Sequence, residues 1–456
     1  MIGFQLSEAA KVLRGELIGN DAFFSAIDTD TRKMQPGKLF VALSGENFDG
    51  HDYLDVAASN GAVGALVARE VETELPIIRV NDTLQSLGTL ASVWRKKSSA
   101  KIIAVTGSNG KTTLKEMIAA ILSQQNEVLA TRGNFNNDIG LPLTLARLQD
   151  ETFAVIEMGA NHQGEISYLS KITQPDIAIL NNAGRAHLEG FGSLEGVARA
   201  KAEILDGLND EGIFVFNADD AFANLWRELS VGKQVLSFGV QAQADIYSPE
   251  ESYQIEWQEE GFVARFEVVT PDDEFEVKIQ LAGEHNRLNA LAAITACHAL
   301  GVTKQDMIEG FAGLAPVPGR LCPLVSQQGA RLIDDSYNAN PDSVLAALQV
   351  LRAAPGYQTL VLGDLGELGA GQIELHAELG RQADALGIHR LLSCGDLSGY
   401  ANDEFAGESL HFSDQKALID FLQNRLNEQD TVLVKGSRAA AMDRVIKALR
   451  KEDVTC

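Results

Sequence analysis

A lysine followed by two threonines stands at a glycine-rich turn in residues 101–122, KIIAVTGSNGKTTLKEMIAAIL. The chain is apolar before the turn, and after it Leu114 and Met117 begin the spacing of an amphipathic helix. A helix start carries free backbone N–H groups and positive partial charge, so this turn can hold a polyphosphate. Lys111 would bridge the outer phosphates, and the Thr112 hydroxyl would ligate Mg²⁺. The segment therefore predicts a nucleotide-dependent enzyme.

The turn departs from the Walker A pattern, G-x-x-x-x-G-K-[ST], whose first glycine would fall at Val105. The nearest upstream glycine is Gly107, which leaves the shorter loop G-x-x-G-K-T. A strand–turn–helix connection without a ligand is the competing interpretation of so short a motif. The lysine lies where the apolar run ends and helical spacing begins, and this position favours the phosphate site.

Further polar residues follow two other apolar runs. Glu157 ends FAVIE, and the residues from Asn181 to His187 follow DIAIL. In open parallel sheets ligands collect at the carboxyl ends of the strands, where Glu157 and His187 could ligate Mg²⁺ or a second metal. Glu157 could instead be a helix cap or a solvated strand end, and His187 an ordinary loop histidine. Beside a phosphate loop, the functional interpretation is the stronger one.

Composition limits the class of protein. A chain of 456 residues predicts two or three domains, and its formal net charge of −25 argues against nucleic-acid binding. A nucleotide site must therefore build its own positive patch. No apolar run approaches the roughly 20 residues of a membrane span. The N-terminus lacks a basic-then-apolar leader, and the cysteines include no C-x-x-C pair, so we expect a cytoplasmic protein without membrane insertion.

The pattern of apolar runs predicts an α/β protein of three domains. Residues 1–98 form a small α/β domain, residues 99–314 a central domain of P-loop type with a parallel sheet, and residues 315–456 a Rossmann-like domain. The predicted strands lie at 39–43, 64–68 and 76–80 in the first domain, and at 153–159, 176–183 and 212–217 in the second. Residues 245–281 predict an antiparallel hairpin, and 315–323, APVPGRLCP, a linker. The runs RLIDD, TLVLGD, RLLSCG and TVLVKG alternate with helices in the third domain.

The order of motifs along essentially the whole chain resembles that of the Mur ligases. They are TGSNGKTT, GNFNNDIGLPLTL, EMGA, NNAGRAHLEGFGS, ARAKAEI, GEHNRLNALAA, GR, DDSYNANPDS, LGDLGELG and VLVKGSRAAAMDRV. The resemblance implies an enzyme that activates a carboxylate with ATP to an acyl phosphate, which an incoming amine attacks. Such chemistry needs a phosphate cradle, a divalent metal and exclusion of water, which agrees with the residues above.

The resemblance also implies roles for particular residues. ATP would be held by the loop residues Gly107, Ser108, Asn109, Gly110, Lys111, Thr112 and Thr113, and by Asn286, Asn289, Arg320 and Asp335. One Mg²⁺ would be bound by Thr112 and Glu157, and a second by His187 with Glu157. Lys201, in SLEGVARAKAEIL, matches the lysine that CO₂ converts to a carbamate, whereas a helical lysine is ordinarily a solvated ion-pair partner. The catalytic set would be Lys111, Glu157, His187 and Lys201.

Substrate contacts are implied in each domain. The uridine diphosphate end would meet Thr31, Arg32, Asp49, Gly50 and His51, where the sequence has DTR in place of the family's frequent DSR. Asn134, Asn136 and Asn137 would meet the sugar-peptide, although asparagine is also a common turn residue. The amine substrate would meet Tyr337, Asn338 and Asn340 in the third domain.

Within the family, the resemblance implies an enzyme that adds D-alanyl-D-alanine to UDP-N-acetylmuramoyl-tripeptide, the last cytoplasmic step toward the peptidoglycan pentapeptide. GNFNN and SYNANPDS favour this reaction, and the chain has no D-N-P-R segment for a diamino acid. The alternatives are a ligase adding the third residue and a folylpolyglutamate-type synthetase. Two alternatives lie outside the ligases. A P-loop switch or motor needs a second aspartate motif after an apolar strand, where this chain has Glu157 followed by Met-Gly. A nucleotide-binding module without catalytic activity is disfavoured by the many polar motifs. We expect a monomer.

Overall fold

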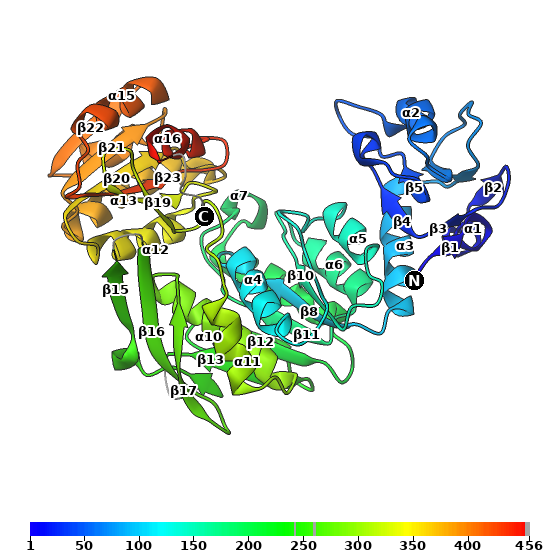
Figure 1. Cartoon of the computed structure of the whole chain (residues 1–456), viewed down its shortest axis with the longest axis horizontal. Helices are drawn as coiled ribbons and strands as arrows, with labels where there is room; N and C mark the ends of the chain where they lie inside the picture. Colours follow the sequence, from blue (N-terminus) through cyan, green and yellow to red (C-terminus); the bar gives the residue numbers. More distant parts are fainter. Residues whose placement is uncertain (241–242, 259–260, 452–456) are drawn as a thin grey trace.

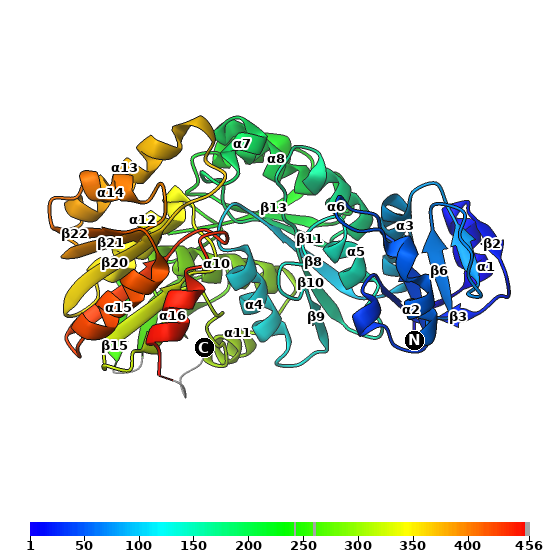
Figure 2. The ribbon, with the colours of Figure 1, turned by 90° about the horizontal axis from the view of Figure 1, so that it is seen from above.

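The computed structural model describes residues 1–240, 243–258 and 261–451. Its helices and strands form three bodies in a row, with the N-terminal body (blue) at one end and the C-terminal body (yellow to red) at the other (Figure 1). The same order is seen from above (Figure 2). In the described ranges, no helix is both long and apolar enough to span a bilayer.

The N-terminal body has a five-stranded sheet in the order β2-β7-β6-β5-β4 and a β1-β3 pair. The predicted strands at 39–43, 64–68 and 76–80 are confirmed as β5 (Lys38–Val41), β6 (Gly64–Val67) and β7 (Ile77–Arg79). The other elements are β1 (Phe4–Gln5), β2 (Glu16–Ile18), β3 (Phe23–Phe24), β4 (Ala26–Asp28), α1 (Leu6–Leu13), α2 (Leu54–Ser59) and α3 (Thr83–Lys97).

The central body is built on one ten-stranded sheet, β15-β16-β14-β13-β12-β11-β8-β10-β9, with β17 paired to β16. Strands β8 to β14 are parallel, as predicted, and the predicted hairpin is confirmed as antiparallel β16 and β17. This hairpin continues the same sheet. The strands are β8 (Lys101–Thr106), β9 (Val128–Ala130), β10 (Phe153–Glu157), β11 (Ile177–Leu180), β12 (Ile213–Asn217), β13 (Gln234–Gly239), β14 (Ile246–Tyr247), β15 (Gln254–Gln258), β16 (Gly261–Val269) and β17 (Glu274–Ile279).

The helices of the central body lie on both faces of its sheet (Figures 1 and 2). They are α4 (Lys111–Leu122), α5 (Gly140–Leu145), α6 (Glu165–Thr173), α7 (Leu188–Phe191), α8 (Leu194–Ala202), α9 (Ala223–Leu229), α10 (Glu284–Ala299) and α11 (Lys304–Ala312). Helix α4 buries Leu114, Met117 and Ile118 in a core that it shares with α10, as the helical spacing predicts.

The helix that carries Lys201 is shorter than the roughly four turns predicted from its sequence. Helix α8 ends at Ala202, and Glu203–Gly207 forms a tight 3₁₀ turn. Glu203 accepts hydrogen bonds from the N–H groups of Gly164 and Ser167 at the start of α6. The Glu203 carboxylate thus accepts from N–H groups at the start of a neighbouring helix, where a negative charge is favourable.

The C-terminal body has a six-stranded sheet, β18-β19-β23-β20-β21-β22, which is parallel except for β18. The Rossmann-like prediction agrees with this arrangement, although the end of the predicted linker is itself strand β18 (Cys322–Val325). The other strands are β19 (Arg331–Asp335), β20 (Tyr357–Gly363), β21 (Arg390–Cys394), β22 (Glu408–Phe412) and β23 (Asp430–Lys435). The helices are α12 (Pro341–Arg352), α13 (Gln372–Ala385), α14 (Gly399–Asp403), α15 (Gln415–Arg425) and α16 (Asp443–Leu449).

Trp94 on α3 connects the N-terminal and central bodies. Its fully buried ring lies 5.4 Å from that of Phe4 and 6.3 Å from that of Phe24, between centroids. Its indole N–H donates to the carbonyl oxygen of Leu148 in the central body, at 2.9 Å. One apolar core thus runs across the boundary between the two bodies.

We predict that Trp94→Ala lowers the free energy of unfolding by about 3–5 kcal/mol, because it leaves a large cavity in a packed core. Trp94→Phe should cost roughly 1–2 kcal/mol, since the ring stays but the Leu148 carbonyl loses its donor. Urea denaturation followed by circular dichroism measures both changes. An unchanged urea midpoint for Trp94→Ala would contradict this account of the junction.

Candidate active site

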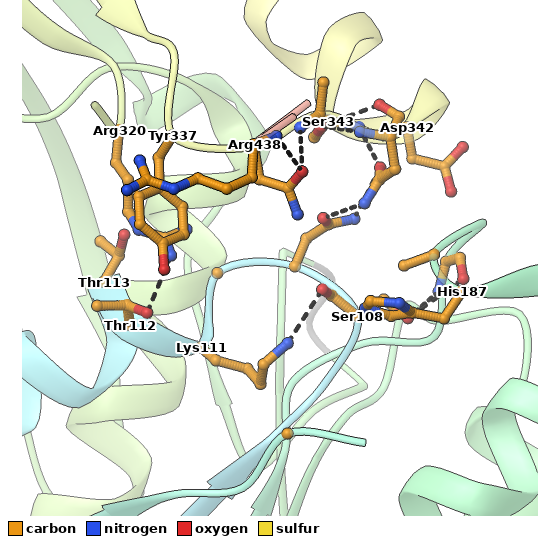
Figure 3. Close-up of a pocket in the computed structure, with 18 of the residues that line it drawn as sticks. Ser108, Lys111, Thr112, Thr113, His187, Arg320, Tyr337, Asp342, Ser343 and Arg438 are labelled. Atoms are coloured by element: carbon orange, nitrogen blue, oxygen red, sulfur yellow. Dashed lines mark hydrogen bonds between the residues drawn. The ribbon is translucent and has the colours of Figure 1, made fainter. Parts of the chain in front are cut away.

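A cavity of about 940 Å³ lies between the central and C-terminal bodies (Figure 3). Both sheets direct the carboxyl ends of their parallel strands toward it, as expected for an α/β ligand site. Most of the predicted site residues line it, namely Ser108, Asn109, Gly110, Lys111, Thr112, Thr113, Asn134, Asn136, Asn137, Glu157, His187, Asn286, Asn289, Arg320, Asp335, Tyr337, Asn338 and Asn340.

Strand register explains how distant residues meet in this cavity. Strand β8 lies between β10 and β11, with Glu157 opposite Val105 and Leu180 opposite Thr106. The segments that follow these strands therefore leave the sheet side by side. They are the phosphate loop, the chain after Glu157 and the chain after Leu180.

Asparagine side chains hold the phosphate loop in place. The Asn109 N–H donates to Asn182 Oδ1 at 2.9 Å, and its carbonyl oxygen accepts from Asn181 Nδ2 at 3.1 Å. Gly110 has φ 79°, and a Cβ there would come within 2.4 Å of Asn289 Oδ1. Only glycine fits this position. Asn182 lines the cavity although no role was predicted for it, and the only sequence signal was its position after an apolar strand.

Lys111, Thr112 and Glu157 form the polar centre of the loop. Lys111 Nζ donates to the Gly107 carbonyl oxygen at 2.7 Å, folded back over the loop (Figure 3). Burial lowers the pKa of Lys111, although the Glu157 carboxylate opposes this shift. Thr112 Oγ1 donates to Glu157 Oε2 at 2.9 Å, and Asn136 Nδ2 donates to Glu157 Oε1 at 2.8 Å.

The Thr112 hydroxyl and the Glu157 carboxylate fit the donor chemistry of Mg²⁺. Both are hard oxygen donors beside a phosphate loop, and protein-bound Mg²⁺ commonly takes few protein ligands and completes its shell with phosphates and water. Among the described residues, no group of three or more His, Cys, Asp or Glu side chains is arranged to hold a metal by itself. This arrangement suits an ion that arrives with a nucleotide.

Lys201 lies just behind the cavity wall, since it is 1% exposed and is not among the lining residues. Its ammonium nitrogen is 3.4 Å from the Ala160 carbonyl oxygen and 5.2 Å from the centroid of the Phe191 ring. Within the described chain, no carboxylate forms an ion pair with it. Burial, together with repulsion from Lys111, lowers the pKa of Lys201 to about 7.

His187 does not meet Glu157 in this structure, since its imidazole Nδ1 faces the Glu367 carboxylate of the C-terminal body. The residue has a left-handed backbone, φ 55°, just before α7. Burial lowers the pKa of His187, the Glu367 carboxylate opposes the shift, and Lys111 and Lys201 add to it. Its predicted place at a second metal stays a prediction.

The C-terminal body supplies a second group of polar residues. Asp335 forms a buried ion pair with Lys435, with its Oδ2 2.5 Å from Nζ. Burial raises the pKa of Asp335, and Lys435 opposes that shift. Arg320 donates to Thr112 Oγ1 at 3.1 Å and lies 4.4 Å from the Tyr337 ring centroid.

Direct contacts join the central and C-terminal bodies at the cavity. Asn340 Nδ2 donates to Asn109 Oδ1 at 2.7 Å, while the Asn340 Oδ1 accepts the Ser343 N–H and caps α12. Arg185 forms ion pairs with Asp342, at 2.7 Å, and Glu378, at 3.0 Å. Arg185, Asp342 and Glu378 were not predicted as site residues, because each looks like an ordinary surface charge in the sequence.

Asn286 and Asn289 are buried on the first turns of α10. Asn286 Nδ2 donates to the Ala282 carbonyl oxygen at 2.8 Å, and Asn289 Nδ2 donates to Asn286 Oδ1 at 3.1 Å. Asn289 Oδ1 accepts from Asn181 Nδ2 at 2.7 Å. Asn286 and Asn289 therefore support the phosphate loop through Asn181 and also line the cavity.

The five residues predicted to meet a uridine diphosphate lie in the N-terminal body and do not line the cavity. Arg32 pairs with Asp30, and Asp49 pairs with His51 and Arg69. Hydrogen bonds from the backbone and ring of His51 lower the pKa of Asp49. Thr31 and Gly50, the other two of these five residues, lie next to Arg32 and His51 in the sequence.

We predict that Lys201→Met stabilises the protein more at pH 7 than at pH 10 in carbonate-free buffer. Between pH 7 and about 10.5 the unfolded chain holds the lysine proton and the folded protein does not, so wild-type stability rises with pH in this window. Unfolding in urea at pH 7, 8.5 and 10 measures the difference. Lys171→Met, at an exposed lysine, should show no such trend, and parallel curves for Lys201→Met and wild type would contradict the lowered pKa.

Comparison with known proteins places the chain among characterised enzymes. Residues 105–297 match the Mur ligase middle domain, residues 319–438 the Mur ligase glutamate ligase domain, and residues 24–124 the Mur ligase family catalytic domain. The chain is 46% identical to UDP-N-acetylmuramoyl-tripeptide–D-alanyl-D-alanine ligase of Escherichia coli strain K12, over 100% of both chains.

Solved structures agree with this relationship. MurF from Acinetobacter baumannii superposes with a TM-score of 0.91 at 36% identity, covering 98% of both chains. MurF ligase from Thermotoga maritima, solved in complex with ADP, gives a TM-score of 0.84 at 30% identity, covering 93% of this chain and 96% of the other. The chain belongs to the Mur ligase family.

Proposed function

We propose that the chain is an ATP-dependent ligase that joins D-alanyl-D-alanine to UDP-N-acetylmuramoyl-tripeptide, which completes the pentapeptide precursor of peptidoglycan. The observation that carries the proposal is a single cavity with a phosphate loop on one wall and a separate α/β body on the other. The full-length similarity to the Escherichia coli ligase of that name supports the choice of substrates. The reaction belongs in the cytoplasm, where ATP is supplied, and we expect the chain to act as a monomer.

The reaction uses the two walls in order. ATP lies with its phosphates on the N–H groups of residues 107–113, and Lys111 leaves the Gly107 carbonyl to contact the outer phosphates. A terminal carboxylate oxygen of the tripeptide attacks the γ-phosphorus, and ADP leaves. The amine of the dipeptide then attacks the acyl carbon, loses a proton and expels phosphate, so an amide bond replaces the acyl phosphate.

Thr112 and Glu157 would hold the Mg²⁺ that accompanies ATP, and the ion would neutralise phosphate charge. His187 is the candidate ligand for a second ion. Arg320 contacts the γ-phosphate, a role supported by its hydrogen bond to Thr112 Oγ1 in the phosphate loop. Asp335 binds the ribose, and Asn286 and Asn289 lie on the adenine side. Closure of the C-terminal body over the loop protects the acyl phosphate from water.

Lys201 carries a carbamate in the active enzyme. Its neutral amine attacks CO₂, a nitrogen–carbon bond forms and a proton leaves, so a buried cation becomes an anion. The lowered pKa supplies the neutral amine near pH 7. The modification also replaces repulsion between Lys201 and Lys111 by attraction.

Each body takes a different part of the substrates. We place the domain boundaries at 98/99 and 314/315, as predicted from the sequence. The N-terminal domain takes the uridine diphosphate through Thr31, Arg32, Asp49, Gly50 and His51. The loop with Asn134, Asn136 and Asn137 guides the sugar-peptide toward Glu157, and the amine substrate enters beside Tyr337, Asn338 and Asn340.

We predict that the protein releases phosphate from ATP only when UDP-N-acetylmuramoyl-tripeptide and D-alanyl-D-alanine are both present, and that mass spectrometry detects the pentapeptide product. Free diamino acid with the dipeptide precursor tests the third-residue ligase, and glutamate with a folate tests the folylpolyglutamate synthetase. Phosphate release from ATP at the same rate with and without any acceptor would contradict the ligase and favour a P-loop NTPase.

We predict that protein equilibrated with ¹³C-bicarbonate shows a carbamate resonance in its ¹³C spectrum, because the Lys201 amine is neutral near pH 7. Lys201→Ala should lose the resonance and lower kcat at least about 100-fold, a loss of roughly 3 kcal/mol of transition-state stabilisation. Lys171→Ala serves as the matched control. A fully active Lys201→Ala enzyme without the resonance would contradict the carbamate.

A further inference from the structure

Arg438 lies in the loop after β23 and lines the cavity on the C-terminal side. Its side chain extends toward Tyr337, and Arg320 lies beside the same ring (Figure 3). The Arg438 Cζ is 5.5 Å from the Tyr337 ring centroid, and the Arg320 Cζ is 4.4 Å from it. Two guanidinium groups thus share one aromatic ring at the edge of the cavity.

Arg438 forms no ion pair with any described residue, although its charge contributes to the lowered pKa of Asp443. Of the other arginines that line the cavity, Arg185 pairs with Asp342 and Glu378, whereas Arg320 forms no ion pair within the described residues and contacts Thr112 and Tyr337 instead. Within the described residues, no carboxylate forms an ion pair with Arg438. In a chain with a formal net charge of −25, an arginine that faces a cavity without such a partner is a strong candidate to bind an anionic ligand.

The loop that carries Arg438 is held in a defined position. The backbone N–H of Arg438 donates to Asn338 Oδ1 at 3.3 Å, and Lys435 Nζ donates to the Asn338 carbonyl oxygen at 3.1 Å. Lys435 in turn pairs with Asp335. The Arg438 side chain is exposed, and among the described residues its guanidinium donates no hydrogen bond, so its paired N–H groups are available to a carboxylate.

A chain of contacts relates Arg438 to the phosphate loop. Thr112 accepts from Arg320, Arg320 lies on Tyr337, and Tyr337 contacts Arg438. Tyr337 therefore connects Arg438 to Arg320, whose guanidinium reaches the phosphate loop. An extended dipeptide spans roughly 7 Å from its amine to its carboxylate. With its amine at the acyl phosphate, its carboxylate lies on the side of Arg438.

We propose that Arg438 binds the C-terminal carboxylate of the incoming D-alanyl-D-alanine and makes the enzyme selective for an acceptor of that length. This inference rests on the proposed function. A single D-alanine is shorter by one residue, about 3.5 Å, and cannot place its amine and its carboxylate at both ends together. Asn338 acts as a positioning residue for the loop.

The test compares D-alanyl-D-alanine with its C-terminal carboxamide in wild type, Arg438→Ala and Arg438→Lys. We expect Arg438→Ala to raise the KM for the dipeptide about 100-fold with little change in kcat, because a charge-assisted pair is lost. In wild type, the KM for the carboxamide should be higher than the KM for the dipeptide by a similar factor, whereas Arg438→Ala should have the same KM for both acceptors. The KM of Arg438→Lys for the dipeptide should lie between those of wild type and Arg438→Ala. The KM values for ATP and the tripeptide substrate should not change.

Arg444→Ala is the matched control, because this arginine is exposed on α16 and does not line the cavity. Wild type that uses both acceptors equally would overturn the proposal, as would Arg438→Ala that still prefers the carboxylate. A raised KM for ATP in Arg438→Ala would also overturn it, since the arginine would then bind the nucleotide. Wild type that makes no amide product with any acceptor would instead contradict the proposed function.

Discussion

Burial of a lysine amine near a second positive charge is the constraint on which this active site depends. Lys201 is fully buried, and the charge of Lys111, which lines the cavity, adds to the effect of burial on its pKa. Removing an ammonium from water is unfavourable, so burial lowers the pKa of both lysines, although the Glu157 carboxylate opposes the shift at Lys111. The same arrangement favours anionic ligands and a modification that changes the sign of one lysine.

The surrounding fold supports this arrangement without neutralising it. Polar but uncharged asparagines hold the phosphate loop, so these contacts add no negative charge to it. Carboxylates are placed around the cavity instead, where Asp342 and Glu378 bind Arg185 and connect the two bodies. The contact from Asn340 to Asn109 couples the cap of α12 to the loop. Movement of the C-terminal body would thus change the phosphate site directly.

The sequence was a good guide to the parts that depend on local pattern. Apolar runs predicted β5, β10, β11, β12 and β20, and the Gly-Lys-Thr turn predicted the start of α4. Local pattern was a poorer guide to the length of α8, because the end of that helix is set by a carboxylate contact with α6. It also did not reveal Arg185, Glu367 or Arg438, since their roles depend on residues more than a hundred positions away or on a neighbouring ring.

The sequence by itself determined the chemistry available, which is a glycine loop before a helix, a lysine, hydroxyls and a strand-end glutamate. These features follow from backbone geometry and side-chain type, and both are local properties. Only the tertiary structure decided which groups share a cavity and what charge each favours. It buried Lys201 within the influence of the Lys111 charge, turned His187 toward Glu367 and brought Arg438 to the ring of Tyr337. Burial and charge proximity arise from contacts between distant segments, and no local pattern contains them.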